Sequence, residues 1–264
     1  MEYIRYIWPG FIEGEHHRVI AERLTAVAKG ELKRLIINMP PRHTKSEFAS
    51  IYFPSWMMGL QPNLKIMQTT HTADLSINFG RKVRNLMDTE EYTKIFQDVN
   101  LAADSKSAGK WQTSKGGEYF AAGVGGAIAG RGADLLIIDD PHSEQDAMSM
   151  NLLDSCYEWY TSGPRQRLQP GGAIVIVMTR WSTMDLTGRL LTRQTELNSD
   201  QWEVIELPAI FEDTEEVLWP EFWQKEELES VKASIPVTKW NAQYQQNPTS
   251  EEGAIIKRDW WQIW

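Results

Sequence analysis

The sequence has a single cysteine, no long apolar run and no excess of positive charge. With Cys156 alone among 264 residues, an internal disulfide framework is excluded and a reducing compartment is expected. No apolar run approaches the roughly 18 residues that a membrane-spanning helix needs, and residues 1–5 lack the basic start of a signal peptide. The net charge of −9 argues against coating nucleic acid by bulk charge, but it allows a local basic patch. We therefore expect a cytoplasmic protein without membrane association.

Apolar segments of two periodicities alternate along the chain. Helical spacing predicts helices over 15–28, 45–60, 73–87, 152–168, 185–194 and 224–233. Short apolar runs predict strands over 31–39, 64–70, 133–138, 173–178 and 203–207, with a hairpin over 110–122. Residues 98–109 are polar and predict a loop. This alternation predicts an α/β fold with a mostly parallel sheet in residues 1–210, followed by a small lid or linker subdomain in residues 211–264.

The segment Leu35–Ser46 has the layout of a phosphate-binding loop. An apolar strand stops at two prolines, a polar loop follows, and Lys45 and Ser46 open the next helix. In such a loop, backbone N–H groups face phosphates, a lysine reaches the terminal phosphates and a hydroxyl holds Mg²⁺. We expect nucleotide contacts from Pro41, Arg42, His43, Thr44, Lys45 and Ser46. Taken alone, the segment is equally consistent with a proline-punctuated turn into a helix capped by Thr44.

The loop lacks the glycines that are usual in phosphate-binding loops. Met39 and Thr44 stand at the two glycine positions. A β-branched residue such as Thr44 strongly disfavours a positive φ. Either the loop does not need the left-handed conformation, or Thr44 is strained.

A second apolar strand, Leu135–Asp140, ends on paired carboxylates. In an ATPase, such a strand delivers one carboxylate to the Mg²⁺ shell and a second to the attacking water. We expect Asp139 to hold Mg²⁺ opposite Ser46, largely through water, and Asp140 to orient or deprotonate the water. An Asp-Asp-Pro turn is the alternative. Because the carboxyl ends of parallel strands share one edge of a sheet, Thr179 at the end of a third strand is expected to join this site.

Together, these motifs resemble the ATPase domain of the large terminase subunits of tailed bacteriophages. The resemblance rests on Pro40–Ser46, Gly130–His142 and Thr179–Trp181, with His16–His17 upstream and Asn241–Pro248 near the end. It implies a RecA-like core with an additional strand, a small lid, and ATP and Mg²⁺ as cofactors. It also implies a motor that threads double-stranded viral DNA into a procapsid in the host bacterial cytoplasm. The implied partners are DNA, the portal protein, the small terminase subunit and further copies in a ring (a pentamer in this family), with a monomer in isolation.

The resemblance also implies roles for residues outside the loop. An upstream segment contacts adenine in the family, so His16 and His17 are candidates, with ordinary helix N-terminal residues as the alternative. Thr179 matches the sensor that couples hydrolysis to DNA movement. Arg131 is the candidate for an arginine finger that acts on a neighbouring subunit. Arg42 is its rival, and a surface charge is the alternative.

Two features distinguish this sequence from the full-length terminases that it resembles. Asp140 stands where relatives usually carry Glu, which sets the carboxylate about 1.5 Å further back and predicts slow hydrolysis without partners. The nuclease domain of full-length relatives is expected to be absent, because no spare carboxylate cluster remains for two metals. The aromatic segment 258–264 would lie where that domain starts.

The alternatives to a packaging motor are a helicase-like or remodelling ATPase on DNA and a weakly hydrolysing nucleotide-binding assembly module. The basic side of the helix over 73–87 is either a solvated face or a DNA-facing one.

Overall fold

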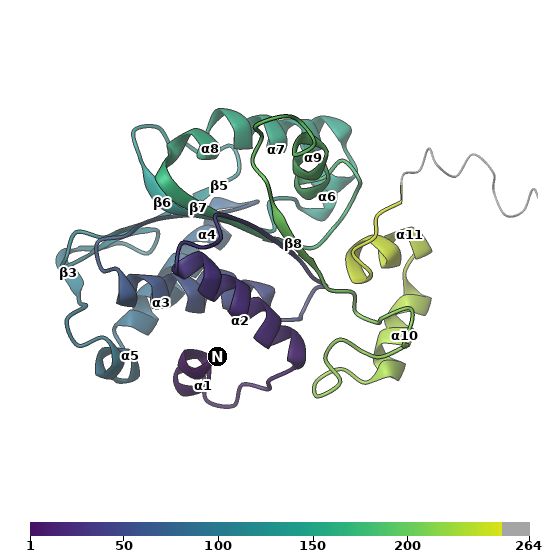
Figure 1. The fold of residues 1–264 in the computed structure, drawn as a ribbon, viewed down its shortest axis with the longest axis horizontal. Coiled ribbons are helices and arrows are strands. Elements are labelled where there is room, and N and C mark those ends of the chain that lie inside the picture. Colours follow the sequence, from purple (N-terminus) through teal and green to yellow (C-terminus); the bar gives the residue numbers. More distant parts are fainter. Residues whose placement is uncertain (250–264) are drawn as a thin grey trace, which may run out of the picture.

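In the described part of the chain, one eight-stranded sheet lies between two layers of helices (Figure 1). The computed structural model describes residues 1–249, without the side chains of Ser105 and Lys106, so the segment 258–264 lies outside the described residues. The strands are β1 (Arg34–Asn38), β2 (Lys65–Thr70), β3 (Leu101–Lys106), β4 (Lys110–Thr113), β5 (Glu118–Gly123), β6 (Ala133–Asp139), β7 (Leu168–Met178) and β8 (Glu203–Glu206). Their order is β3-β4-β5-β2-β6-β7-β1-β8. The run from β5 to β8 in this order is parallel, and β4 is antiparallel to both neighbours.

The strand β7 lies between β1, which leads into the predicted phosphate-binding loop, and β6, which carries the paired carboxylates. Its insertion is the additional strand that the sequence resemblance implies. The register places Asn38 beside Met178, and Asp139 beside Val177. The three strand ends therefore meet at one edge of the sheet, and the predicted fold class is confirmed.

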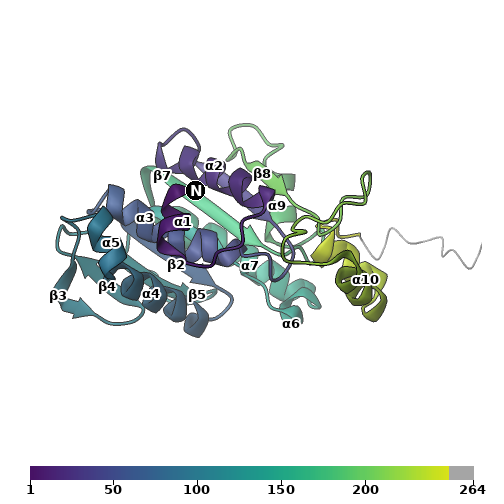
Figure 2. The same cartoon turned by 90° about the horizontal axis from the view of Figure 1, so that it is seen from below.

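Both faces of the sheet are buried, which explains the continuous apolar runs of its central strands. Side chains alternate between faces along a strand, so Leu35 and Ile37 pack in one cluster and Ile36 packs in the other. One face carries α1 (Glu2–Ile7), α2 (Glu15–Ala28), the π-helix η1 (Glu47–Tyr52), α3 (Phe53–Leu60), α4 (Ala73–Met87) and α5 (Glu90–Ile95), as Figure 2 shows. The other carries α6 (Glu144–Ala147), α7 (Met150–Ser162), α8 (Pro164–Arg167) and α9 (Leu186–Arg193).

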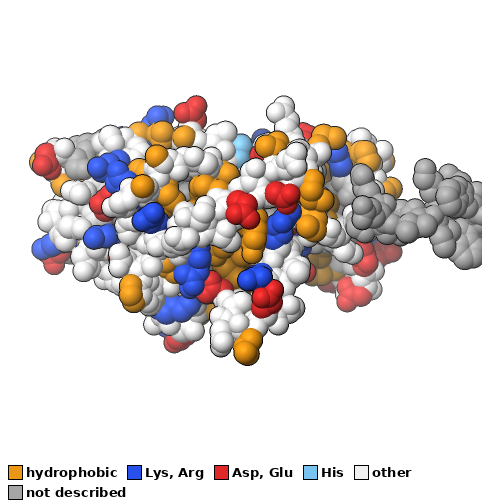
Figure 3. All heavy atoms as spheres, turned by 90° about the horizontal axis from the view of Figure 1, so that it is seen from above, with side chains coloured by type: hydrophobic (Ala, Val, Ile, Leu, Met, Phe, Trp, Pro, Cys, Tyr) orange, Lys and Arg blue, Asp and Glu red, His pale blue; other side chains and the backbone are white. Residues whose placement is uncertain are grey.

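The surface over α7 and α9 mixes hydrophobic, basic and acidic side chains, without a field of one sign (Figure 3). Within residues 1–249, the helices are all too short or too polar to cross a bilayer.

Residues 209–249 form a small unit beside β8 (Figure 1). It contains α10 (Lys225–Ser234), α11 (Val237–Lys239) and the π-helix η2 (Trp240–Tyr244). Ala209, Leu228 and Trp240 form its own buried cluster. A boundary at residue 210 between an ATPase core and a lid stays a prediction.

Two local predictions were wrong. Residues 98–109 do not form a loop throughout, because β3 pairs with β4 at the edge of the sheet. An edge strand needs few apolar side chains when backbone pairing holds it. The helix predicted over 152–168 breaks at Gly163–Pro164, where proline starts the new helix α8.

Candidate active site

The loop after β1 alternates between left-handed and ordinary backbone. Arg42 has a φ of 63° and Thr44 a φ of 69°, whereas His43, between them, does not have a positive φ. Such alternation turns successive N–H groups toward one side and makes a concavity that binds anions. The Phe48 N–H donates to the Thr44 carbonyl (3.1 Å), so the helical turn starts within the loop. Thr44 therefore adopts the strained left-handed conformation, which was one of the two possibilities that the sequence left open.

Asp140 joins the three strand ends. Its Oδ2 lies 3.2 Å from Lys45 Nζ, and its Oδ1 accepts a hydrogen bond from the Thr179 N–H (2.7 Å). Asp140 is itself left-handed, with a φ of 41°, a conformation that Asp tolerates better than most residues. The Thr179 hydroxyl donates to the Met39 carbonyl (3.3 Å). The structure thus brings Lys45, Asp140 and Thr179 together as predicted.

Asp139 is buried and held by two hydroxyls. Ser46 Oγ donates to Asp139 Oδ1 (2.9 Å), and Ser50 Oγ donates to Asp139 Oδ2 (2.6 Å). Gln68 Nε2 donates to Ser50 Oγ (3.0 Å) and fixes its orientation. Burial, with the nearby Asp140, raises the pKa of Asp139, whereas both serine hydroxyls favour its ionised form.

The donors around Asp139 fit Mg²⁺. A serine hydroxyl beside a carboxylate offers the oxygen ligands that this ion prefers. No group of three or more His, Cys, Asp or Glu side chains in residues 1–249 could form a metal cage. Mg²⁺ needs no such cage, since it is usually bound by one or two carboxylates together with phosphates and water.

His16, His17 and His43 form a buried cluster with Trp219 beside the loop. The rings of His16 and His17 lie 5.5 and 5.0 Å from the Trp219 ring. Burial lowers the pKa of His16 to about 3 and those of His17 and His43 to about 4. His17 Nε2 lies 2.7 Å from Thr44 Oγ1, so this histidine contacts the loop directly. Contact of His16 or His17 with adenine stays a prediction.

Arg131 lies away from the other predicted residues. It precedes β6, whereas Asp139 ends it, so roughly 20 Å of strand separates the two. Arg131 Nη1 pairs with Glu118 Oε1 at 2.7 Å, and its guanidinium lies 3.9 Å from the centre of the Phe120 ring. The rival Arg42 is exposed on the loop and makes no ion pair with the part of the chain that the structure describes. Arg131 therefore cannot act on the candidate site of the same chain in this conformation.

The fold of this chain occurs in solved structures. The chain is similar to the large terminase of bacteriophage HK97, with a TM-score of 0.61 and 13% identity over 93% of this chain and 53% of that one. The ATPase domain of the large terminase of Thermus phage P74-26 gives a TM-score of 0.52 with 15% identity, over 86% and 92%. This chain has the fold of a phage large terminase ATPase domain.

The chain spans about half the length of the HK97 large terminase. A variant of the P74-26 domain gives a TM-score of 0.54 with 13% identity, over 86% of this chain and 93% of that one. The sequence matches no protein-family model, and no curated protein matches it. The resemblance inferred from the motifs is confirmed at the level of the fold.

Several residues of the candidate active site were not predicted. His71 places its N–H and Nδ1 at 3.3 and 3.2 Å from the Asp140 carbonyl. It follows β2, whose end adjoins that of β6, so the rule that located Asp140 also applies to it. Ser50 lies one helical turn after Ser46, a spacing that puts two side chains on one face. Gln68 carried no such signal, because its role depends on a contact across the fold.

Arg180 links this edge of the sheet to the C-terminal unit. Its backbone N–H donates to Gln246 Oε1 (3.1 Å), and its Nε donates to Asp185 Oδ2 (3.0 Å). Its Nη1 lies 3.3 Å from Glu206 Oε1. The strand end after Thr179, where the terminase resemblance places the coupling motif, therefore contacts residues 209–249 directly.

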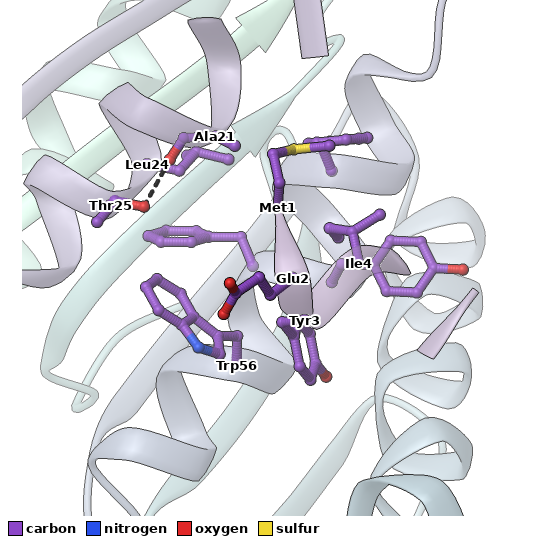
Figure 4. Close-up of a pocket in the computed structure, with 11 residues that line it drawn as sticks. Met1, Glu2, Tyr3, Ile4, Ala21, Leu24, Thr25 and Trp56 are labelled. Carbon is purple, nitrogen blue, oxygen red and sulfur yellow. Dashed lines mark hydrogen bonds between the residues drawn. The ribbon is translucent and has the colours of Figure 1, made fainter. Parts of the chain in front are cut away.

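A cavity of about 290 Å³ lies between α1, α2 and α3 (Figure 4). Its lining is mainly apolar, with Glu2 beside Trp56 and the Thr25 hydroxyl bonded to the Ala21 carbonyl (2.6 Å). Neither the loop residues 41–46 nor the paired carboxylates line it. This cavity is therefore separate from the candidate active site.

Proposed function

We propose that the chain is the ATPase part of a DNA-packaging motor, which hydrolyses ATP with Mg²⁺ to drive double-stranded viral DNA into a procapsid. One observation carries the proposal. Lys45, Ser46, Asp139, Asp140 and Thr179 meet at the carboxyl edge of the parallel part of the sheet, where Ser46 is hydrogen-bonded to Asp139, and Asp140 is paired with Lys45 and hydrogen-bonded to the Thr179 N–H. The terminase ATPase fold supports the same function.

Each residue of the site would have a distinct role in phosphoryl transfer. The amides of the loop and the Lys45 ammonium would bind the phosphates and offset their charge. Ser46 Oγ and Asp139 would hold Mg²⁺, which, when bound, neutralises charge that develops on the phosphate oxygens. Asp140, anchored by the Thr179 N–H, would orient the attacking water and accept its proton. The Thr179 hydroxyl, which donates to the Met39 carbonyl, would have to turn from it to sense the γ-phosphate.

We propose that Arg131 acts in trans on the site of a neighbouring copy in a ring. Its distance from the site of its own subunit supports a role between subunits rather than within one. For this role, its pair with Glu118 would have to open. Arg42, exposed on the loop, remains the rival for a finger.

The exposed side of α4 is the proposed DNA contact. Arg81 and Lys82 are both exposed there, and neither forms an ion pair with another described residue. Lys82 Nζ lies 5.8 Å from the centre of the Phe79 ring, so the lysine side chain lies along the helix. Unpaired surface cations of this kind gain binding energy by neutralising phosphates. Binding to the portal protein, the small terminase subunit and the procapsid rests on the family resemblance.

A weakly hydrolysing nucleotide-binding module is the second candidate. The strain at Thr44 and the short side chain of Asp140 favour it, because both change the usual geometry of the site. A helicase-like enzyme is less well supported, since residues 1–249 contain one sheet and not two RecA-like domains.

Replacement of Lys45 tests the ATPase proposal. Lys45→Ala should lower Mg²⁺-dependent ATP turnover by about 100-fold or more, because it removes the cation that stabilises the transferring phosphoryl group. Lys33→Ala, which removes an exposed lysine just before β1, is the matched control and should leave turnover unchanged. Parent-like turnover of Lys45→Ala would show that the site assignment is wrong. Tight ATP binding with negligible turnover of the parent, with DNA present, would favour the module.

A further inference from the structure

Thr44 adopts a backbone conformation that its own side chain opposes. Its φ of 69° lies in the left-handed region, which β-branched residues avoid because the branched Cβ crowds the backbone. Arg42, two residues earlier, is also left-handed, so the loop has two left-handed residues, one on either side of His43. Such a conformation persists only when its surroundings hold it in place.

A directed chain of hydrogen bonds holds Thr44 through His17. The Gly14 N–H donates to His17 Nδ1 (2.8 Å), so this nitrogen is an acceptor. A neutral ring then carries its proton on Nε2, which lies 2.7 Å from Thr44 Oγ1 and can only donate to it. Thr44 Oγ1 in turn donates to the His43 carbonyl (2.5 Å). Every donor and acceptor in this series of hydrogen bonds, from the Gly14 N–H to the His43 carbonyl, is matched.

The His17 ring itself cannot move easily. It is completely buried and stacks on Phe48, with ring centres 5.0 Å apart and planes 16° apart. Phe11 meets it at 4.7 Å and Trp219 at 5.0 Å, both with their rings steeply inclined to it. The ring therefore presents Nε2 to Thr44 from a fixed position.

We propose that His17 is a positioning residue of the phosphate-binding loop, which holds Thr44 in the left-handed conformation through the Nε2–H to Oγ1 hydrogen bond. A side-chain contact thus replaces the conformational freedom that a glycine has at this position. The effect on nucleotide binding rests on the proposed function, whereas the contact itself does not. His17 need not touch the nucleotide to act in this way.

The inference predicts that His17 matters only while residue 44 is a threonine. A glycine adopts a positive φ without help, so the Thr44→Gly background should no longer need His17. The test is a double-mutant cycle of the parent, His17→Ala, Thr44→Gly and the double variant, with ADP affinity measured by calorimetry. His17→Ala should weaken binding by about tenfold in the parent and by less than about twofold in the Thr44→Gly background. Equal losses in both backgrounds would overturn the inference.

A neighbouring histidine is the matched control. His16 is nearly as buried as His17 and lies against the same tryptophan, but the hydrogen bond to Thr44 comes from His17 and not from His16. His16→Ala should therefore change ADP affinity equally in both backgrounds. His17→Gln, which keeps an N–H donor, should retain most of the parent's affinity, and a loss as large as that of His17→Ala would contradict the hydrogen bond.

A spectroscopic measurement keeps the test independent of activity and of the folding of the variants. Nitrogen-15 NMR of the parent's histidine rings at pH 7 should show His17 protonated on Nε2 and not on Nδ1. The opposite tautomer, or a doubly protonated ring, would overturn the inference. If the parent binds no nucleotide but shows the expected tautomer, the proposed function fails while the contact stands.

Discussion

Lys45 Nζ and Asp140 Oδ2 lie 3.2 Å apart, so the cation of the proposed phosphate-binding loop and the carboxylate that follows β6 form an ion pair. The side chain of Lys45 is 7% exposed and that of Asp140 is 29% exposed. A bound terminal phosphate would share the same ammonium. Asp140 therefore has two opposing effects on a nucleotide: it would orient the water for hydrolysis, and it would compete with the phosphate for Lys45.

Removal of the Ser50 hydroxyl should impair Mg²⁺ use. Ser50→Ala takes away one of the two hydroxyls on Asp139 and leaves the Gln68 amide without its acceptor. We expect a loss of about 1–3 kcal/mol in the free energy of unfolding and a several-fold higher Mg²⁺ concentration for half-maximal turnover. Mg²⁺ titration of ATP hydrolysis and urea unfolding measure the two effects.

Ser76→Ala is the control for this prediction. Ser76 is a buried serine on α4 that donates to the Ala122 carbonyl (2.7 Å) and, unlike Ser50, makes no hydrogen bond to Asp139. It should lose stability without a change in Mg²⁺ dependence. An identical Mg²⁺ requirement in parent and Ser50→Ala would contradict the role given to Ser50.

The buried histidines should make the protein less stable in mild acid. The folded-state pKa values of about 3 for His16 and about 4 for His17 and His43 lie below the ordinary value of 6.5. The unfolded chain therefore binds more protons between about pH 4 and 6.5, so stability is complete above 6.5 and falls as the pH drops through this window. Each histidine contributes at most about 1.4 kcal/mol per pH unit.

A variant isolates this contribution from that of other groups. The raised pKa of Asp139 acts in the opposite direction over part of the same range, because the folded state then binds the extra proton. His16→Gln does not titrate, so its stability should fall less steeply than that of the parent between pH 6.5 and 4.5. Urea unfolding at several pH values gives both slopes, and equal slopes would mean that His16 stays solvated and titrates normally.

If Arg131 acts as an arginine finger on a neighbouring copy, the specific ATPase activity should depend on protein concentration. The specific ATPase activity of the parent should rise steeply with protein concentration, and Arg131→Ala should remove this rise. Glu118→Ala is the matched control, since it breaks the same ion pair but keeps the guanidinium. If Glu118→Ala and Arg131→Ala lose activity equally, Arg131 has a structural role. A rise abolished by Arg42→Ala instead would assign the finger to Arg42.

The fold and the centre of the site could be predicted because the apolar runs reveal the strands and the strand ends reveal where the site residues meet. Apolar runs of strand length identified β1, β6 and β7, and parallel strands bring their carboxyl ends to one edge. That rule alone placed Lys45, Asp140 and Thr179 together. It also shows why Arg131 lies elsewhere: a residue just before a strand belongs to the opposite edge, a signal that the motif resemblance obscured.

The remaining features depend on contacts between distant parts of the chain. The packing of Trp219 against His16 and His17 joins segments about 200 residues apart, and no local pattern indicates it. The strand β3 is held by pairing with β4, and its polar sequence resembles a loop. The conformation of Thr44 could be posed as a question from the sequence, but the answer depended on the position of His17.

The behaviour of Asp140→Asn tests the central claim most directly. The carboxylate can no longer accept a proton from water or compete for Lys45, so ATP turnover should fall by about 100-fold or more while calorimetry shows ATP affinity equal to or higher than that of the parent. Asp134→Asn, which changes a carboxylate near the other end of β6, is the matched control and should keep parent-like turnover. Parent-like turnover of Asp140→Asn would contradict the proposed active site.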